Sequence, residues 1–158
     1  KTATSKAVST AILYYYTPFG LVLAANALFD IATALHFDPL LFTAGQSKLE
    51  PAHTKQLDSI TAMLIERPGI HLTLCGTSSY IDTSILYPDA VKTAEKTASK
   101  QLVLDKAQTK TLLDLAEQRG NAVKDYLVNN RKIDASRLIV CEPEYQENME
   151  SPSVEVSI

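Results

Sequence analysis

Arg119 is the residue whose type and position most clearly predict chemistry. It falls on the apolar stripe of an amphipathic helical pattern, between Ala116 and Val123, where an unpaired guanidinium would be costly. We therefore expect an anionic group to meet it: either an Asp or Glu of the same chain, in an internal salt bridge, or the carboxylate of a ligand. The pattern alone favours the internal salt bridge. The neighbouring Gly120 costs a helix interior about 1 kcal/mol relative to alanine, which predicts close approach of another backbone or of a ligand.

The other reactive side chains predict neither a catalytic site nor a metal site. Cys75 and His71 stand four apart in an expected strand, about 13 Å from each other, which is too far for a nucleophile and its base. His36 and His53 fall on different elements with no third ligand evident. A free, buried Cys75 is the default, although a disulfide becomes feasible if Cys141 lies on an adjacent strand in matched register. With no phosphate-binding or nucleophile motif in the sequence, we expect no enzyme, no metal and no cofactor.

The elements that must position these residues alternate between strand and helix. Alternating hydrophobicity and turn residues predict strands over residues 35–43, with a break, bulge or edge at Pro39, and over 70–76, 138–142 and 153–158. Helical periodicity predicts helices over residues 50–67, 89–100 and 108–129. The rest of 77–104 is irregular, and 142–150 is expected to be an acidic, solvated loop. This order predicts a two-layer α+β domain with helices on one face of a mixed sheet.

The first part of the chain differs from the rest and predicts a separate helical segment over residues 1–34. From Ala7 to Phe29 the sequence carries no charge, but Pro18 and Gly20 interrupt the run where a membrane-spanning helix would be continuous. We expect two short helices whose apolar sides pack on the domain of residues 35–158, on another part of a parent protein or on a second copy. A membrane-surface segment is the less favoured alternative, because Lys1 and Lys6 are the only basic residues nearby.

The composition excludes several classes of protein. A chain of 158 residues with 46% hydrophobic and 21% charged residues is that of one ordinary globular domain, not of a disordered, collagenous or disulfide-scaffold protein. Its formal net charge of -3 does not favour a nucleic-acid partner. The first residue is Lys and no signal-peptide pattern follows it, so we expect a piece of a longer or processed protein.

Four segments together resemble OmpA-like domains. They are residues 115–127, which carry Arg119, residues 132–138, and residues 42–49 and 68–76, which match the motifs of the family's first two strands. The resemblance covers residues 42–158 apart from an insertion at about 80–108 and implies a βαβαββ sheet with helices on one face. In that family an Arg of this helix and an Asp at the end of the second strand hold the diaminopimelate residue of peptidoglycan, in the bacterial envelope.

The sequence departs from this family where binding would take place. Residues 77–79 read Thr-Ser-Ser, whereas the family carries a polar pair ending in Asp. The other departures are Leu112, where the family carries Asn, and residues 151–153, where it carries Asn-Arg-Arg. Of the expected pair only Arg119 remains. In a domain that still bound peptidoglycan, Asp82 or the hydroxyl of Ser79 would have to replace the lost carboxylate.

A second resemblance covers nearly the whole chain. Residues 17–21, Phe42, Gly45, Leu49, residues 66–68 and the Arg119 helix are similar to the C-terminal region of an AsmA-related family of envelope proteins called domain of unknown function 748. This resemblance implies a large parent protein that is anchored in the inner membrane, reaches into the periplasm and is linked to outer-membrane lipid homeostasis.

These observations predict a noncatalytic domain for interaction or placement within the periplasm, whose main partner is the rest of the parent protein. The first alternative is a working peptidoglycan binder that holds the peptide carboxylate with Arg119. Another alternative is a lipid-handling module in which the uncharged run from Ala7 to Phe29 lines a groove. An enzyme would need two convergent titratable side chains, and the sequence offers no such pair.

Overall fold

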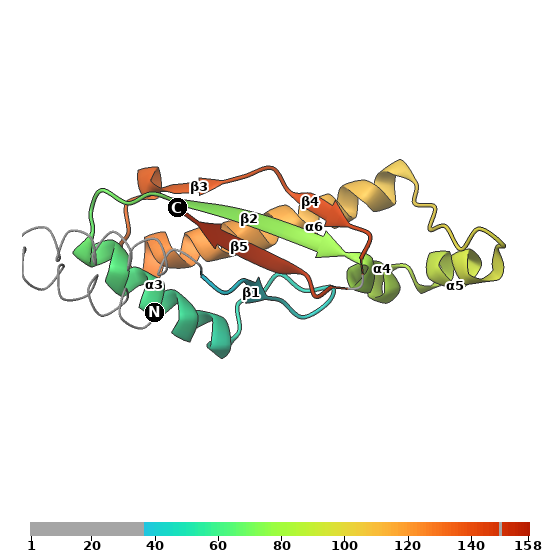
Figure 1. Cartoon of the computed structure of the whole chain (residues 1–158), viewed down its shortest axis with the longest axis horizontal. Helices are drawn as coiled ribbons and strands as arrows, with labels where there is room; N and C mark the ends of the chain where they lie inside the picture. Colours follow the sequence, from blue (N-terminus) through green and yellow to red (C-terminus); the bar gives the residue numbers. More distant parts are fainter. Residues whose placement is uncertain (1–36, 149) are drawn as a thin grey trace, which may run out of the picture. The chain divides into compact units, whose positions relative to one another are not determined.

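The computed structural model describes residues 37–148 and 150–158, which contain five strands together with helices (Figure 1). The expected N-terminal helices of residues 1–34 lie outside the described residues, and the boundary at residue 35 remains a prediction. In chain order the elements are β1 (Leu40–Leu41), α3 (Pro51–Glu66), β2 (Leu72–Ser79), α4 (Tyr80–Leu86), α5 (Pro88–Lys96), α6 (Lys106–Asp125), the π-helical turn η1 (Tyr126–Asn130), the 3-10 turn η2 (Ala135–Arg137), β3 (Leu138–Val140), β4 (Glu144–Gln146) and β5 (Ser153–Ser157).

The strands form one mixed sheet around β2. The strand order is β1-β5-β2-β3, and β4 pairs with the far part of β2 beyond β3. β2 runs parallel to β3 and β4 and antiparallel to β5, with Leu74 opposite Val140 on one side and Val156 on the other. β1 is a two-residue edge strand that begins directly after Pro39, and proline cannot donate to a sheet ladder.

Helices α3 and α6 form the second layer. Alternate residues of the strands and one stripe of each helix meet in a single buried core, and Figure 1 shows α6 running along the back of β2 and β5. The core side chains are Leu40, Phe42, Leu57, Ile60, Leu64, Leu72, Leu74, Val123, Leu127, Ile133, Leu138, Val154 and Val156. The predicted two-layer α+β class is therefore confirmed.

Arg137 ties the end of α3 to the start of β3. Its Nε donates to the carbonyl of Ile70 at 2.9 Å, and its Nη2 donates to those of Leu64 at 3.0 Å and Arg67 at 2.8 Å. The last carbonyls of a helix have no partner within the helix, so a guanidinium there supplies donors to them, although the Arg67 carbonyl also accepts from Ile70 N at 3.2 Å. This contact explains why a cation stands just before β3.

The region after residue 76 differs most from the predictions. β2 continues to Ser79, α4 follows it at once, and α5 ends at Lys96, where the backbone of Thr97 turns extended. The acidic segment 142–150, expected to be a loop, contains β4, whose Tyr145 hydroxyl meets the Thr83 hydroxyl at 3.0 Å. The helix predicted over residues 89–100 is present as α5. Periodicity could not reveal the end of β2, α4 or β4, because each is short and is formed through contacts with distant residues.

The face of the sheet opposite the helices carries polar side chains together with the exposed Ile139, which pairs with Thr73. Leu72 and Leu74 point into the core, so Thr73 points away from it, and so do Glu155 and Ser157 of β5. The expected packing of the N-terminal helices on the domain concerns residues outside those described. Of the described helices, none is both long and apolar enough to span a membrane.

Cys75 and Cys141 form a disulfide, which overturns the default of a free, buried Cys75. The pairing of Leu74 with Val140 brings the next residue of each segment side by side, and Cys141 N donates to the Leu74 carbonyl at 3.1 Å. The two Cα atoms are 5.1 Å apart, which is an ordinary separation for a disulfide. Both residues are half-buried, and the bond closes a loop that contains α4, α5 and α6.

We expect the double variant Cys75→Ser/Cys141→Ser to lose about 2–4 kcal/mol of unfolding free energy, because the bond restricts the unfolded chain over a separation of 66 residues. Urea unfolding with and without reductant measures this loss. The reductant should lower the midpoint of the wild type and leave that of the double variant unchanged. Equal midpoints for the oxidised wild type and the double variant would contradict the stabilising role of the bond.

Candidate functional site

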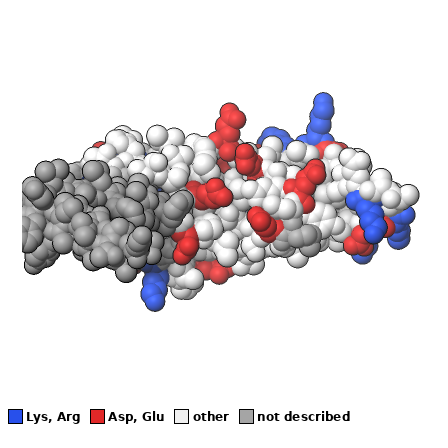
Figure 2. Space-filling view, in the orientation of Figure 1, with Lys and Arg blue, Asp and Glu red and all other residues white. Residues whose placement is uncertain are grey.

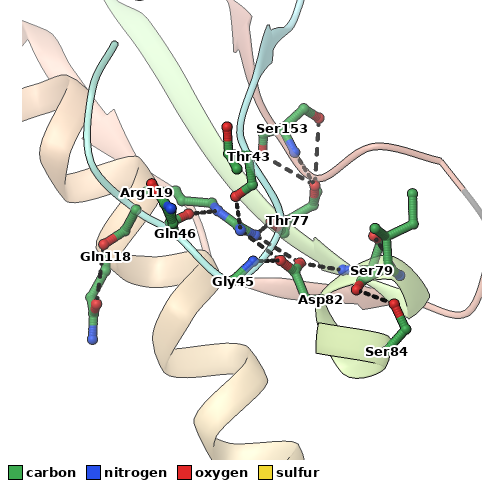
Figure 3. Close-up of polar contacts among 12 residues, drawn as sticks. Thr43, Gly45, Gln46, Thr77, Ser79, Asp82, Ser84, Gln118, Arg119 and Ser153 are labelled. Atoms are coloured by element: carbon green, nitrogen blue, oxygen red, sulfur yellow. Dashed lines mark hydrogen bonds and ion pairs between the residues drawn. The ribbon is translucent and has the colours of Figure 1, made fainter. Parts of the chain in front are cut away.

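The Arg119 guanidinium lies at the end of β2, between α4, α6 and the loop after β1 (Figure 3). Its side chain is 0% exposed, and so is that of Asp82. Nη1 donates to Asp82 Oδ2 at 2.9 Å, and Nη2 donates to Asp82 Oδ1 at 2.7 Å. This is the bidentate geometry in which an arginine binds a carboxylate most strongly. The structure therefore supplies the internal partner that the helical pattern favoured.

The remaining guanidinium hydrogens go to backbone carbonyls. Nε donates to Gln46 O at 2.8 Å, Nη1 to Thr77 O at 2.9 Å and Nη2 to Thr43 O at 3.4 Å. A guanidinium has five N–H groups, and these five bonds use all of them. Phe42 adds a ring whose centroid is 5.6 Å from Cζ of the guanidinium. Arg119 has no hydrogen-bond donor left for a ligand.

Asp82 is held as completely as its partner. Besides Arg119, its Oδ1 accepts from Gly45 N at 2.7 Å and its Oδ2 from Ser79 N at 2.9 Å. Burial alone would raise the pKa of the Asp82 carboxyl, but the hydrogen bonds from Arg119 and the two amides, together with the guanidinium charge, outweigh it and hold the pKa below its ordinary value of 3.8. Asp82 is therefore the ionised partner of a closed ion pair.

The start of α4 places Asp82 at this point. Ser79 is the N-cap of the helix: its Oγ accepts from Ile81 N at 3.3 Å, while Asp82, three residues on, accepts from the Ser79 amide. This reciprocal arrangement is a capping box, which fixes the first turn. The Ser79 hydroxyl is thus used by α4 and does not contact the guanidinium, and Ser79 is fully buried.

A left-handed turn places the other amide. Gly45 has φ +73°, which a residue with a side chain rarely adopts, and a Cβ built there would lie 3.2 Å from Ile85 Cγ2 of α4. In this turn Gly45 N donates to Asp82, and the carbonyls of Thr43 and Gln46 accept from Arg119. We define the Arg119 site as Arg119, Asp82, Thr77 and residues 43–46.

Close contact between α6 and β2 brings Arg119 to the strand end. A Cβ at Gly76 would overlap the Ala116 carbonyl oxygen and lie 3.2 Å from Gly120 N. A Cβ at Gly120 would lie 3.1 Å from Val140 Cγ1. The close approach expected at Gly120 is therefore present, and its partner is the sheet, not a ligand.

The structure brings together all three residues proposed from the sequence, Arg119, Asp82 and Ser79. The backbone groups of residues 43–46 and Thr77 were not predicted from the sequence, because any residue type can supply a carbonyl that accepts a hydrogen bond. The contacts of His53 were not predicted either: it is buried, stacks on Phe42 with centroids 4.6 Å apart and bonds to the Glu50 amide and the Leu41 carbonyl. In the described part of the chain no three His, Cys, Asp or Glu residues are grouped so as to hold a metal ion.

Comparison with known proteins identifies the fold. No protein-family model and no curated protein matches the sequence. Among solved structures, the chain is similar to the OmpA-like domain of FopA1 from Francisella tularensis subsp. tularensis SCHU S4, with 16% sequence identity, a TM-score of 0.53 and coverage of 76% of this chain and 69% of that one. The C-terminal domain of Helicobacter pylori MotB (residues 125–256) aligns at 14% identity and a TM-score of 0.49, over 75% of this chain and 81% of that one. The chain has an OmpA-like fold, as its motifs predicted.

Proposed function

We propose that this chain is a noncatalytic OmpA-like domain that serves in interaction or placement within the bacterial envelope and does not bind the cell-wall peptide through Arg119. One observation carries this proposal: the guanidinium is fully buried and all five of its N–H groups are bonded within the chain. The residue that would hold a ligand carboxylate in other OmpA-like domains already holds an internal one.

A ligand could reach Arg119 only by displacing Asp82. It would have to replace two charge-assisted hydrogen bonds to the guanidinium and would leave the Asp82 carboxylate without its cation. The displaced Asp82 carboxylate would also have to move into solvent. This movement would break its hydrogen bond from Ser79 N, which holds the first turn of α4. A peptide carboxylate would form the same two hydrogen bonds to the guanidinium that Asp82 already forms. Exchanging one carboxylate for the other therefore yields no net free energy for binding at this site.

Two features support localisation in the bacterial envelope. The Cys75–Cys141 disulfide belongs to an oxidising compartment such as the periplasm, since thiols stay reduced in most cytosols. The OmpA-like fold fits that compartment.

We further propose, on the resemblance of residues 17–21 and 42–49 to the AsmA-related family, that the domain is the C-terminal part of a large inner-membrane-anchored protein linked to lipid homeostasis. Residues 1–34 would then pack on the domain of residues 35–158.

Sedimentation with purified sacculi tests the proposal. We expect the chain to stay in the supernatant, while an OmpA-like domain that keeps both the Arg and the strand-end Asp sediments with the wall. The Asp82→Asn variant weakens the internal partner, so we also compare it with the wild type. Retention of the wild type on sacculi would overturn the proposal if it depended on Arg119.

One observation favours the alternative function, a working peptidoglycan binder. An arginine and a carboxylate, the two charged groups that the resemblance implies for such a site, are both present and are paired. In that case wild-type chain would sediment with sacculi, and Arg119→Lys would lower retention at least tenfold because a lysine lacks the bidentate fork. The matched control is Arg131→Lys at an exposed arginine, with folding of both variants checked by circular dichroism.

A further inference from the structure

The insertion after α4 forms a basic end of the domain. We call residues 88–110 the lysine tip: it comprises α5, the segment that follows and the first turn of α6. Figure 1 shows α5 beyond the end of the sheet, away from the strands that form the core. The lysine tip shares no residue with the Arg119 site, so its role is a separate question.

Charge is distributed unevenly between this tip and the rest of the domain. The tip has five exposed lysines and three acidic residues, whereas the rest of the described chain has eight basic residues and fourteen acidic ones. Figure 2 shows most of the visible blue side chains toward the α5 end of the view and most of the red ones over its middle. The lysines are Lys92, Lys96, Lys100, Lys106 and Lys110.

Most of this positive charge is available to a partner. Lys110 is paired with Asp114 at 2.7 Å, and Lys92 lies 3.9 Å from the nearly fully exposed Asp89. Within residues 37–148 and 150–158, Lys96, Lys100 and Lys106 make no ion pair, and all three are exposed.

An apolar element lies among these lysines. Val103, in the segment between α5 and α6, is 79% exposed, which is the highest exposure of any large hydrophobic residue that the structure describes. It stands at a groove of about 330 Å³ whose wall on α5 consists of Asp89, Ala90, Thr93 and Ala94, with Thr97 directly after the helix. The tip thus combines exposed positive charges with an aliphatic side chain that gains by leaving water.

We propose that the lysine tip docks on an anionic lipid surface, with Val103 entering the headgroup layer and the lysines resting on the phosphates. Each lysine near such a surface strengthens binding about fivefold, and insertion of an apolar side chain adds to this. The acidic remainder of the domain is repelled by the same surface, so the charge separation also orients the molecule with α5 toward the lipid.

The residue types favour a lipid surface over an acidic protein. Protein interfaces are enriched in arginine and depleted in lysine, and the tip contains five lysines and no arginine. A lysine is a point charge on a flexible stem that suits a fluid layer of phosphates, whereas the planar guanidinium suits a carboxylate fixed in one geometry. An acidic protein is therefore the less favoured partner.

Vesicle sedimentation of the full chain tests this docking. Wild-type protein is mixed with vesicles of phosphatidylcholine alone or with about one third phosphatidylglycerol. We expect preferential binding to the anionic vesicles, and Lys96→Glu/Lys100→Glu should weaken it at least about tenfold. Adding Val103→Asp to this variant should weaken binding to the anionic vesicles further. The matched control, Lys48→Glu/Lys55→Glu, makes the same charge change at two exposed lysines outside the tip and should change binding less than twofold.

Three results would overturn the proposal. One is equal binding to neutral and anionic vesicles, which would assign binding to an apolar segment elsewhere in the chain. Another is equal weakening by the tip variant and the control variant, which would reduce the effect to net charge. The third is the absence of wild-type binding at low salt, which would leave an acidic protein as the partner of this surface.

Discussion

Asp82→Ala is expected to lower the free energy of unfolding by about 3–5 kcal/mol, more than any other single side-chain truncation in the Arg119 site. The substitution leaves the Arg119 guanidinium 0% exposed and without its anion. It also removes the acceptor of the buried Ser79 N and of the partly buried Gly45 N. The chain would have to open the site to solvent or unfold.

A matched control separates this effect from the loss of any aspartate near α4. Asp89→Ala makes the same chemical change at a side chain that is 98% exposed and lies 3.9 Å from Lys92. We expect the unfolding free energy of that variant to stay within about 0.5 kcal/mol of the wild type. Urea unfolding followed by circular dichroism measures both variants. Equal, small losses would show that the Asp82–Arg119 pair does not hold the domain together.

The pH dependence of stability gives a second measure of the same pair. The pKa of Asp82 is lowered in the folded protein, so its contribution is present above the ordinary value of 3.8 and is lost as the pH falls through the folded pKa. We expect the wild type to lose stability more steeply than Asp82→Asn below about pH 4, because the amide does not titrate. Parallel curves for the two proteins would mean that Asp82 is not ionised in the folded state.

Much of the fold follows from the order of polar and apolar residues. The helix predicted over residues 50–67 is α3, and the helix over 108–129 is α6 continued by η1, because both carry a long apolar stripe with clear ends. The burial of Arg119 and its need for an anion follow from the same stripe. Such features are local, and a single sequence contains them in full.

The identity of the partner is not a local property. Ser79 stands where OmpA-like domains carry Asp, which led us to expect a site without its acidic member, whereas the carboxylate is supplied three residues later by Asp82. One signal could have shown this: a Ser followed three residues on by Asp is the pattern of a capping box, and a helix starting at residue 80 would turn Asp82 back toward the strand end. The disulfide was undecided for the same reason, since only the register of β2 and β3 brings Cys75 to Cys141.

Gly76→Ala is the second substitution for which we expect a large loss of stability, about 3 kcal/mol or more. A methyl group at this position meets the backbone of α6: it overlaps the Ala116 carbonyl oxygen and lies 2.9 Å from the carbonyl carbon. Backbone atoms inside a helix cannot turn aside as a side chain can. The added methyl therefore separates α6 from β2, and this separation also pulls Arg119 away from the carbonyl of Thr77.

Two other glycines give graded controls for this prediction. At Gly69 a Cβ meets nothing within 4 Å, so Gly69→Ala should change the unfolding free energy by less than about 1 kcal/mol. At Gly120 the added Cβ meets the side chain of Val140, which can shift, and alanine gains about 1 kcal/mol of helix propensity, so Gly120→Ala should lie between the two. The order of loss expected from urea unfolding is Gly76, then Gly120, then Gly69. A Gly76→Ala variant as stable as Gly69→Ala would mean that α6 does not need this close contact, and the burial of Arg119 would then require another cause.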